Sequence, residues 1–195
     1  MNTIVAETTE QGEMLVDVYQ RLASDRILFI CNRIDDKLAT DIVATLLLKD
    51  CEDCENKITL FINSDGGDIR NALMIYDMMQ LVESPIETVC IGSAMDEAAI
   101  ILAAGTPGLR FATKNAVIAV GQLVHDWMAF SDLTDAKTAL DQATSDNKKM
   151  MEIIAKSSGR TLKKAMMDFE RRVFMNASKA VKSKLIDKVI TFNKK

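Results

Sequence analysis

The sequence predicts an α/β fold in which short buried strands alternate with helices. Apolar or β-branched runs at 27–31, 58–62 and 88–91 have the length and composition of buried strands. Between these runs, apolar residues recur every three or four positions, as in helices that cover a sheet with one face. No tandem repeat, low-complexity tract or linker divides the 195 residues, so we expect one compact domain with parallel strand connections.

The first strand and helix unit is expected before residue 50. Residues 1–14 are polar with no strong period, and a short helix is expected over 17–22. The strand 27–31 then leads to a helix over about 36–49, whose apolar face should pack on a sheet. That face contains Leu38, Ala39, Ile42, Val43, Leu46 and Leu47.

The second unit repeats this arrangement. Residues 58–62 form a predicted strand, 64–68 a glycine turn, and the following helix ends before Pro85. This helix should also present one apolar face to the sheet. That face contains Ile69, Leu73, Tyr76 and Met79.

A third strand is expected over 88–91, and Gly92 permits a sharp turn after it. Residues 98–104 are helix formers, and Gly105 ends this helix. A strand, elbow and helix of this kind hold one side chain at a helix N-terminus, where backbone N–H groups favour developing negative charge. The residue at this position, a common seat for a nucleophile, is Asp96.

One long helix dominates the second half of the chain. Short strands are expected at 111–112 and 117–120, and apolar residues over 134–158 follow helical spacing until Gly159. A helix of about 25 residues extends roughly 37 Å, too long to lie over a small sheet, so part of it should project. A helix from Thr161, the apolar pair 174–175, a helix over 178–185 and a strand over 189–191 complete the chain.

The composition describes a mildly acidic globular protein. Its 24 basic and 28 acidic residues give a net charge of −4, and no basic run indicates a nucleic-acid surface. No apolar run approaches the roughly 20 residues that a membrane helix needs. Residues 1–12 lack the basic and apolar regions of a signal peptide, so we expect a cytoplasmic protein without nucleic-acid or membrane partners.

Cysteine and histidine usage gives little support to metal chemistry. Cys51 and Cys54 form a Cys-x-x-Cys, for which the alternatives are a metal or redox motif and an exposed turn with two unpaired thiols. Cys31 and Cys90 lie in predicted strands, and His125 is the single histidine, so a four-ligand zinc site is hard to assemble. We therefore expect neither a cofactor nor a metal.

Two motifs together resemble the proteolytic subunit family of the ATP-dependent Clp protease, ClpP. They are the turn Phe61-Ile62-Asn63-Ser64-Asp65-Gly66-Gly67-Asp68 and the strand, elbow and helix over 87–105. The likeness extends over 7–190, with a short extra stretch after Gln122. It implies a ClpP/crotonase-like fold of repeated β-β-α units with a projecting handle helix.

The resemblance also implies an assembly. Within a single domain over 1–195, residues 1–16 would form a flexible axial segment, and about 123–158 the handle that interlocks two seven-membered rings into a tetradecamer. The rings would contain this chain alone or together with an active paralogue. A Clp/Hsp100 AAA+ ATPase would dock on them and supply unfolded protein for degradation.

The family's three catalytic positions are all replaced. From the flanking residues, the serine position is Asp96, the histidine position Gly121 and the aspartate position Arg172. Serine-protease chemistry needs a hydroxyl nucleophile, an imidazole base and a carboxylate that orients the imidazole. Asp96 is a poor nucleophile toward an amide, Gly121 has no side chain, and Arg172 would repel an imidazolium. This pattern indicates an inactive, ClpR-like homologue.

Part of the scaffold around these positions is kept. Gly67 and Glu97 occupy the positions whose backbone N–H groups form the family's oxyanion hole. The missing imidazole at Gly121 leaves a space, and we predict that the guanidinium of Arg172 enters it to pair with Asp96. The alternative is a wet pocket in which both charges are solvated.

Three functions follow from these observations. The first is an inactive subunit with a structural or regulatory role in a ring-shaped Clp protease for ATP-dependent protein degradation. The second is a serine-type endopeptidase that uses substitutes such as Ser93 and His125. The third is a crotonase-like protein that binds acyl thioesters, with Asp96 and Glu97 as acid or base. The extent of the resemblance and the triple replacement favour the first.

Overall fold

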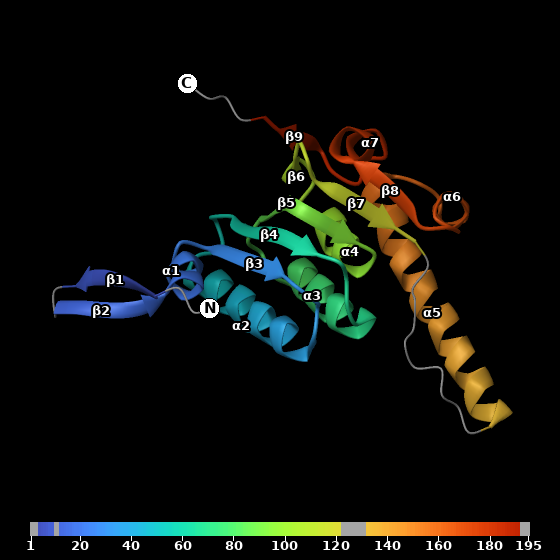
Figure 1. Cartoon of the computed structure of the whole chain (residues 1–195), viewed down its shortest axis with the longest axis horizontal. Helices are drawn as coiled ribbons and strands as arrows, with labels where there is room; N and C mark the ends of the chain where they lie inside the picture. Colours follow the sequence, from blue (N-terminus) through green and yellow to red (C-terminus); the bar gives the residue numbers. More distant parts are fainter. Residues whose placement is uncertain (1–3, 10–11, 122–131, 192–195) are drawn as a thin grey trace.

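The computed structural model describes residues 4–9, 12–121 and 132–191, and these form a mixed α/β fold. Figure 1 shows a central sheet with helices packed against it, an N-terminal hairpin at one end of the molecule and a long helix projecting at the other. The predicted fold class is therefore confirmed, and the arrangement is consistent with the ClpP fold.

The central sheet is mostly parallel. Its strands are β3 (Ile27–Cys31), β4 (Ile58–Ser64), β5 (Ile86–Met95), β6 (Arg110–Thr113), β7 (Val117–Val120), β8 (Val173–Asn176) and β9 (Lys188–Ile190). The order β3-β4-β5-β6-β9 is parallel throughout. β7 pairs in parallel with the last residues of β5, and β8 pairs with β7 in the antiparallel direction. The carboxyl end of β5 thus lies beside β7 and close to β8.

Helices cover the sheet and extend beyond it. They are α1 (Val18–Ser24), α2 (Asp36–Glu52), α3 (Ile69–Leu81), α4 (Glu97–Ala103), α5 (Leu133–Ser158), α6 (Leu162–Asp168) and α7 (Ala177–Lys182). α2 and α3 lie side by side below the sheet in the view of Figure 1. Every residue of α4 is buried, because this helix is enclosed by the sheet, α3 and α5.

Side-chain caps explain where the main helices begin and end. The Asp35 carboxylate accepts a hydrogen bond from the N–H of Leu38 at 2.8 Å, and Asp68 accepts one from Arg70 at 2.8 Å. Both bonds satisfy N–H groups that a first helical turn leaves without partners. Gly159 ends α5 with φ of 65°, as its glycine predicts.

The predicted apolar face of α3 packs on the core. Ile69 and Met79 are buried, and Leu73 and Tyr76 are half-buried against the core cluster. Ala72 and Ile75, which have no exposed surface, extend this face. Leu73 and Tyr76 also line a gap beside α5, which the local period of α3 cannot reveal.

The N-terminal segment forms a hairpin in its described part. β1 (Ile4–Thr9) pairs with β2 (Gly12–Asp17) in an antiparallel ladder, with Ile4 opposite Asp17. The role of residues 1–16 as a flexible axial segment stays a prediction. β-branched residues at both ends of β1 favour a strand even though the segment is polar overall.

α5 is long, as predicted, but only its second half packs on the body. Met150 and Ile154 are fully buried, whereas Leu140 is 67% exposed on the part that projects in Figure 1. Of the predicted handle region, residues 123–131 lie outside the described residues, and the domain limits stay predictions. α7 ends at Lys182, three residues before the predicted end. Within the described ranges, no helix has the length and apolar character needed to cross a membrane.

Candidate functional site

The sharp turn between β5 and α4 lies at Asp96 itself. Asp96 has φ of 47° and ψ of −102°, a conformation that costs a non-glycine residue about 1 to 3 kcal/mol. Its N–H donates to the carbonyl oxygen of Ala119 on β7 at 2.8 Å, and its own carbonyl accepts from the N–H of Ala99 at 3.1 Å. The elbow is therefore held from the sheet on one side and from the helix on the other.

Gly92 does not make this turn, contrary to the prediction. β5 continues through Gly92 to Met95, and a Cβ at Gly92 would lie closer than 3.0 Å to the side chain of Asn63. Asn63 needs that space because its Oδ1 accepts a hydrogen bond from the N–H of Ser93 at 3.0 Å. This bond spans the irregular register between β4 and β5. The absence of a side chain at Gly92 thus allows β4 and β5 to approach each other closely.

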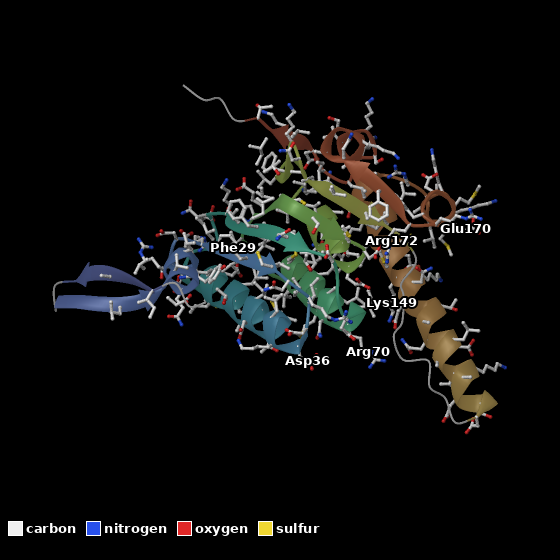
Figure 2. All side chains as sticks on the ribbon, in the orientation of Figure 1. Phe29, Asp36, Arg70, Lys149, Glu170 and Arg172 are labelled. Atoms are coloured by element: carbon white, nitrogen blue, oxygen red, sulfur yellow. The ribbon has the colours of Figure 1, made fainter. Side chains whose placement is uncertain are left out.

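Asp96 and Arg172 form the predicted ion pair. A terminal guanidinium nitrogen of Arg172, which is labelled in Figure 2, lies 2.6 Å from Oδ2 of Asp96. The Asp96 side chain is 7% exposed and that of Arg172 is 42% exposed, so a buried carboxylate meets a partly solvated cation. Burial raises the pKa of Asp96, and Arg172 and the Gly121 backbone N–H oppose this shift without cancelling it. Oδ1 of Asp96 is buried without a hydrogen-bond partner among the described residues.

Gly121 lies against Arg172. A Cβ at Gly121 would lie 2.7 Å from the Cα and 2.8 Å from the Cβ of Arg172. The two residues extend the β7–β8 ladder, in which Val120 pairs with Val173. The structure therefore brings together the three positions that the sequence singled out, and the arginine fills the space beside the glycine.

Gly67 and Glu97 are also close, and the Glu97 side chain joins them. The N–H of Gly67 donates to Oε2 of Glu97 at 3.1 Å, and Glu97 is only 7% exposed. A Cβ at Gly66 would lie closer than 3.0 Å to the same oxygen. The sequence predicted a backbone N–H role for Glu97, and an acid or base role for its side chain in the crotonase-like alternative, but not this contact with Gly67. No local pattern reveals the direction of its side chain, since the partner turn is thirty residues earlier.

Ser93 contacts carboxylate and amide groups. Its hydroxyl donates to Oδ1 of Asp65 at 2.9 Å, and both residues lie at the exposed end of the strands. His125, its suggested partner, lies outside the described residues. The structure therefore gives Ser93 a hydrogen-bonding role between β5 and the end of β4.

The cysteines are free thiols. Cys51 is exposed in the last turn of α2, and Cys54 is half-buried just after it. Burial raises the pKa of Cys90 to about 11, which suits an unreactive core thiol. No group of three or more potential ligands is placed to hold a metal within the described part of the chain.

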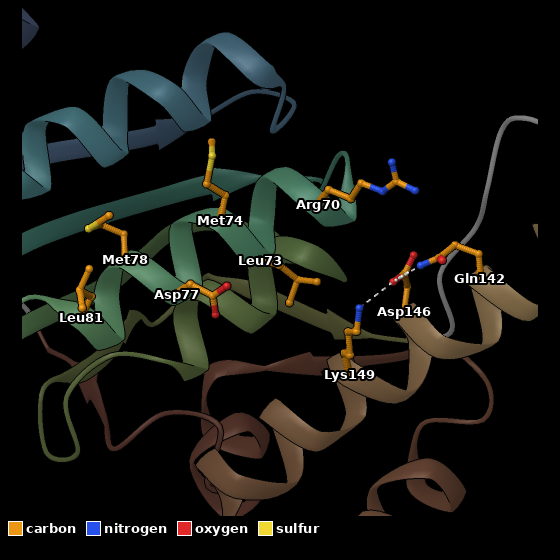
Figure 3. Close-up of a pocket in the computed structure, with 9 residues that line it drawn as sticks. All are labelled: Arg70, Leu73, Met74, Asp77, Met78, Leu81, Gln142, Asp146 and Lys149. Carbon is orange, nitrogen blue, oxygen red and sulfur yellow. Dashed lines mark hydrogen bonds and ion pairs between the residues drawn. The ribbon is translucent and has the colours of Figure 1, made fainter.

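A pocket lies between α3 and α5, away from the residues of the elbow. Its volume is about 680 Å³. Figure 3 shows Leu73 of α3 directed toward α5, where the side chain of Lys149 lies 3.5 Å from Oδ1 of Asp146. Met78 and Leu81 also line the pocket. None of the five candidate site residues lines this pocket, so it is separate from the elbow.

A comparison with protein families agrees with the geometry of the elbow and sheet. The family described as Clp protease matches residues 10–193, which is almost the whole chain. This match supports a ClpP-type role in proteolysis, and members of this family generally form rings that work with Clp ATPases. With this match, and with the α/β fold and elbow described above, the chain belongs to the Clp protease family.

Proposed function

We propose that this chain is a catalytically inactive subunit with a structural or regulatory role in a ring-shaped Clp protease. The observation that carries the proposal is the 2.6 Å pair between Asp96 and Arg172 at the elbow. A nucleophile at this position needs a base that accepts its proton. Here the elbow carries a carboxylate, its neighbour is a cation, and Gly121 beside them has no side chain.

The retained scaffold suits assembly. The elbow, the sheet and a long α5 persist although the chemistry is replaced, and Leu140 exposes 67% of its surface on the projecting part of α5. The first half of α5 leaves the body and is therefore available for contact with another subunit. We place α5 in the handle between two seven-membered rings, residues 1–16 at the axial pore, and the particle in the cytoplasm with a Clp ATPase.

Native mass spectrometry of the particle tests this assembly. The tagged chain should be recovered from its own cells at normal expression. We expect a second subunit with an intact serine, histidine and aspartate set in the same particle. Particles that contain only this chain, in one or two rings, would contradict a role in a mixed protease.

A peptidase assay tests the absence of chemistry. The isolated chain should cleave a fluorogenic peptide no faster than buffer, since neither Asp96 nor its neighbours can supply an activated hydroxyl. The Asp96→Ala and Ser93→Ala variants separate turnover by this chain from turnover by contaminants. Turnover that persists in both variants comes from elsewhere, whereas turnover that either substitution abolishes would overturn the proposal.

A further inference from the structure

The turn at Gly66 and Gly67 already holds a carboxylate, that of Glu97. Oε2 of Glu97 accepts the N–H of Gly67 at 3.1 Å. Gly66 has φ of 101° and leaves room for this oxygen, where any side chain would collide with it. The turn is held in place, because the N–H of Ile34 donates to the carbonyl of Gly66 and Asp68 donates to that of Ile34, both at 2.9 Å.

This contact has the chemistry of a ligand complex. A backbone N–H that points into a dry space is the group that binds a carbonyl oxygen, an oxyanion or a carboxylate. Glu97 is 7% exposed, so water does not compete freely for the bond. Burial raises the pKa of Glu97, and the nearby charge of Asp96 adds to this shift. The N–H groups of Glu97 itself and Gly67 and the charge of Arg33 lower the pKa, but they do not cancel the rise.

We propose that Glu97 is an autoinhibitory residue, whose carboxylate is the resident ligand of a small-carboxylate site at the Gly66–Gly67 turn. While Glu97 is in place, no acyl group or free carboxylate can reach the N–H of Gly67. Shortening the side chain opens a site that accepts acetate. The inference rests on the proposed function, to which it adds a second block that is independent of positions 96, 121 and 172.

This block has two consequences for the alternatives to an inactive subunit. A crotonase-like protein needs its oxyanion donors free for a thioester carbonyl, and Gly67 has given its N–H to Glu97. Substitutions that restore only a serine, a histidine and an aspartate would likewise leave this donor occupied.

Acetate titration followed by ¹⁵N NMR tests the inference on the isolated full chain. The probe is sodium acetate against sodium chloride at constant ionic strength. In Glu97→Ala, the Gly67 amide signal should shift saturably with acetate, and acetate should raise the melting temperature more than chloride does. Wild type and Glu97→Gln, which keeps an oxygen on Gly67, should show neither effect. Glu83→Ala is the control for loss of an exposed carboxylate.

A pH titration keeps the inference falsifiable if Glu97→Ala does not fold. In wild type, the Gly67 amide signal should move with a midpoint above pH 4.5 as Glu97 is protonated, and this movement should be absent in Glu97→Gln. The inference would be overturned if the Gly67 amide signal of wild type did not move with pH. It would also be overturned if acetate changed neither the Gly67 amide signal nor the melting temperature of a folded Glu97→Ala variant. Neither result depends on which subunits the particle contains, so the two proposals fail separately.

Discussion

Asp96 combines a strained backbone with a buried charge, and Arg172 only partly compensates for that charge. Because burial raises its pKa, the folded chain holds the proton of Asp96 more tightly than the unfolded chain does. The stabilising effect of this proton is complete below the unfolded pKa of about 3.9, and is lost as the pH rises through the folded pKa. At neutral pH the ionised carboxylate therefore depends on Arg172.

Removal of Arg172 should expose this dependence. We expect Arg172→Ala to lower the free energy of unfolding by about 1 to 3 kcal/mol at pH 7, because it leaves a buried carboxylate unpaired. The loss should shrink as the pH falls and Asp96 takes up a proton. Urea denaturation at pH 7 and at lower pH measures both effects.

Two variants serve as controls for this prediction. Arg171→Ala removes the same charge from the exposed neighbouring position and should change stability little. In an Asp96→Asn background, Arg172→Ala should cost much less than in wild type. An equal loss in both backgrounds would show that the ion pair does not stabilise the elbow.

At the scale of elements, two segments pack closely against each other. They are the turn between β4 and α3 and the segment after β3. Gly67 forms a parallel bridge with Ile34. A Cβ at Gly67 would lie 2.5 Å from the backbone nitrogen and 2.8 Å from the carbonyl carbon of Ile34. Backbone atoms cannot rotate away as the end of a side chain can, so the two segments must separate to admit a methyl group.

Gly67→Ala should therefore destabilise the chain by roughly 2 to 3 kcal/mol, within the range for overpacked sites. Gly108→Ala is the matched control, because a Cβ there meets nothing within 4 Å and only its φ of 92° opposes the change. We expect a loss of about 1 kcal/mol for this control. Thermal unfolding of both variants checks the order, and a larger loss at Gly108 would contradict it.

At the scale of the whole molecule, Arg110 joins the C-terminal segment to the core. Arg110 is 6% exposed, and its guanidinium group donates to Asp187 at 2.6 and 2.9 Å. The same group donates to the carbonyl oxygens of Ala103 at the end of α4 and Ser157 at the end of α5. One buried cation thus links β6, two helix ends and the residue before β9.

Asp187→Asn should lower the free energy of unfolding by about 2 to 4 kcal/mol at pH 7, because it leaves the buried Arg110 without its counterion. Hydrogen bonds from Arg110 lower the pKa of Asp187 despite its partial burial. Its contribution is therefore present above the unfolded pKa of about 3.9 and is lost as the pH falls through the lower folded pKa.

The variant should accordingly lose less stability than wild type when the pH falls from about 5 to about 2. Urea denaturation across this range measures the difference. Asp41→Asn removes an acid from an exposed ion pair with Lys37 and should leave the pH profile unchanged. Parallel pH profiles for wild type and Asp187→Asn would contradict a stabilising role of the Arg110 pair.

The sequence by itself determined the α/β class, the positions of most strands and helices, and the elbow at Asp96. These features follow from local composition: buried strands are short apolar runs, and capped helices have a period near 3.6. The Asp96–Arg172 pair was also predictable, because the absent side chain at Gly121 left space between two residues of opposite charge.

Other side-chain contacts were decided only by the tertiary structure. Glu97 turns toward Gly67, Gly92 makes room for Asn63, and Leu73, which is half-buried against the core, also lines a gap beside α5. In each case the partner belongs to another element, so its distance depends on how strands and helices pack. Local periodicity contains no information about that distance, and the carboxylate at the Gly66–Gly67 turn became visible only with the chain folded.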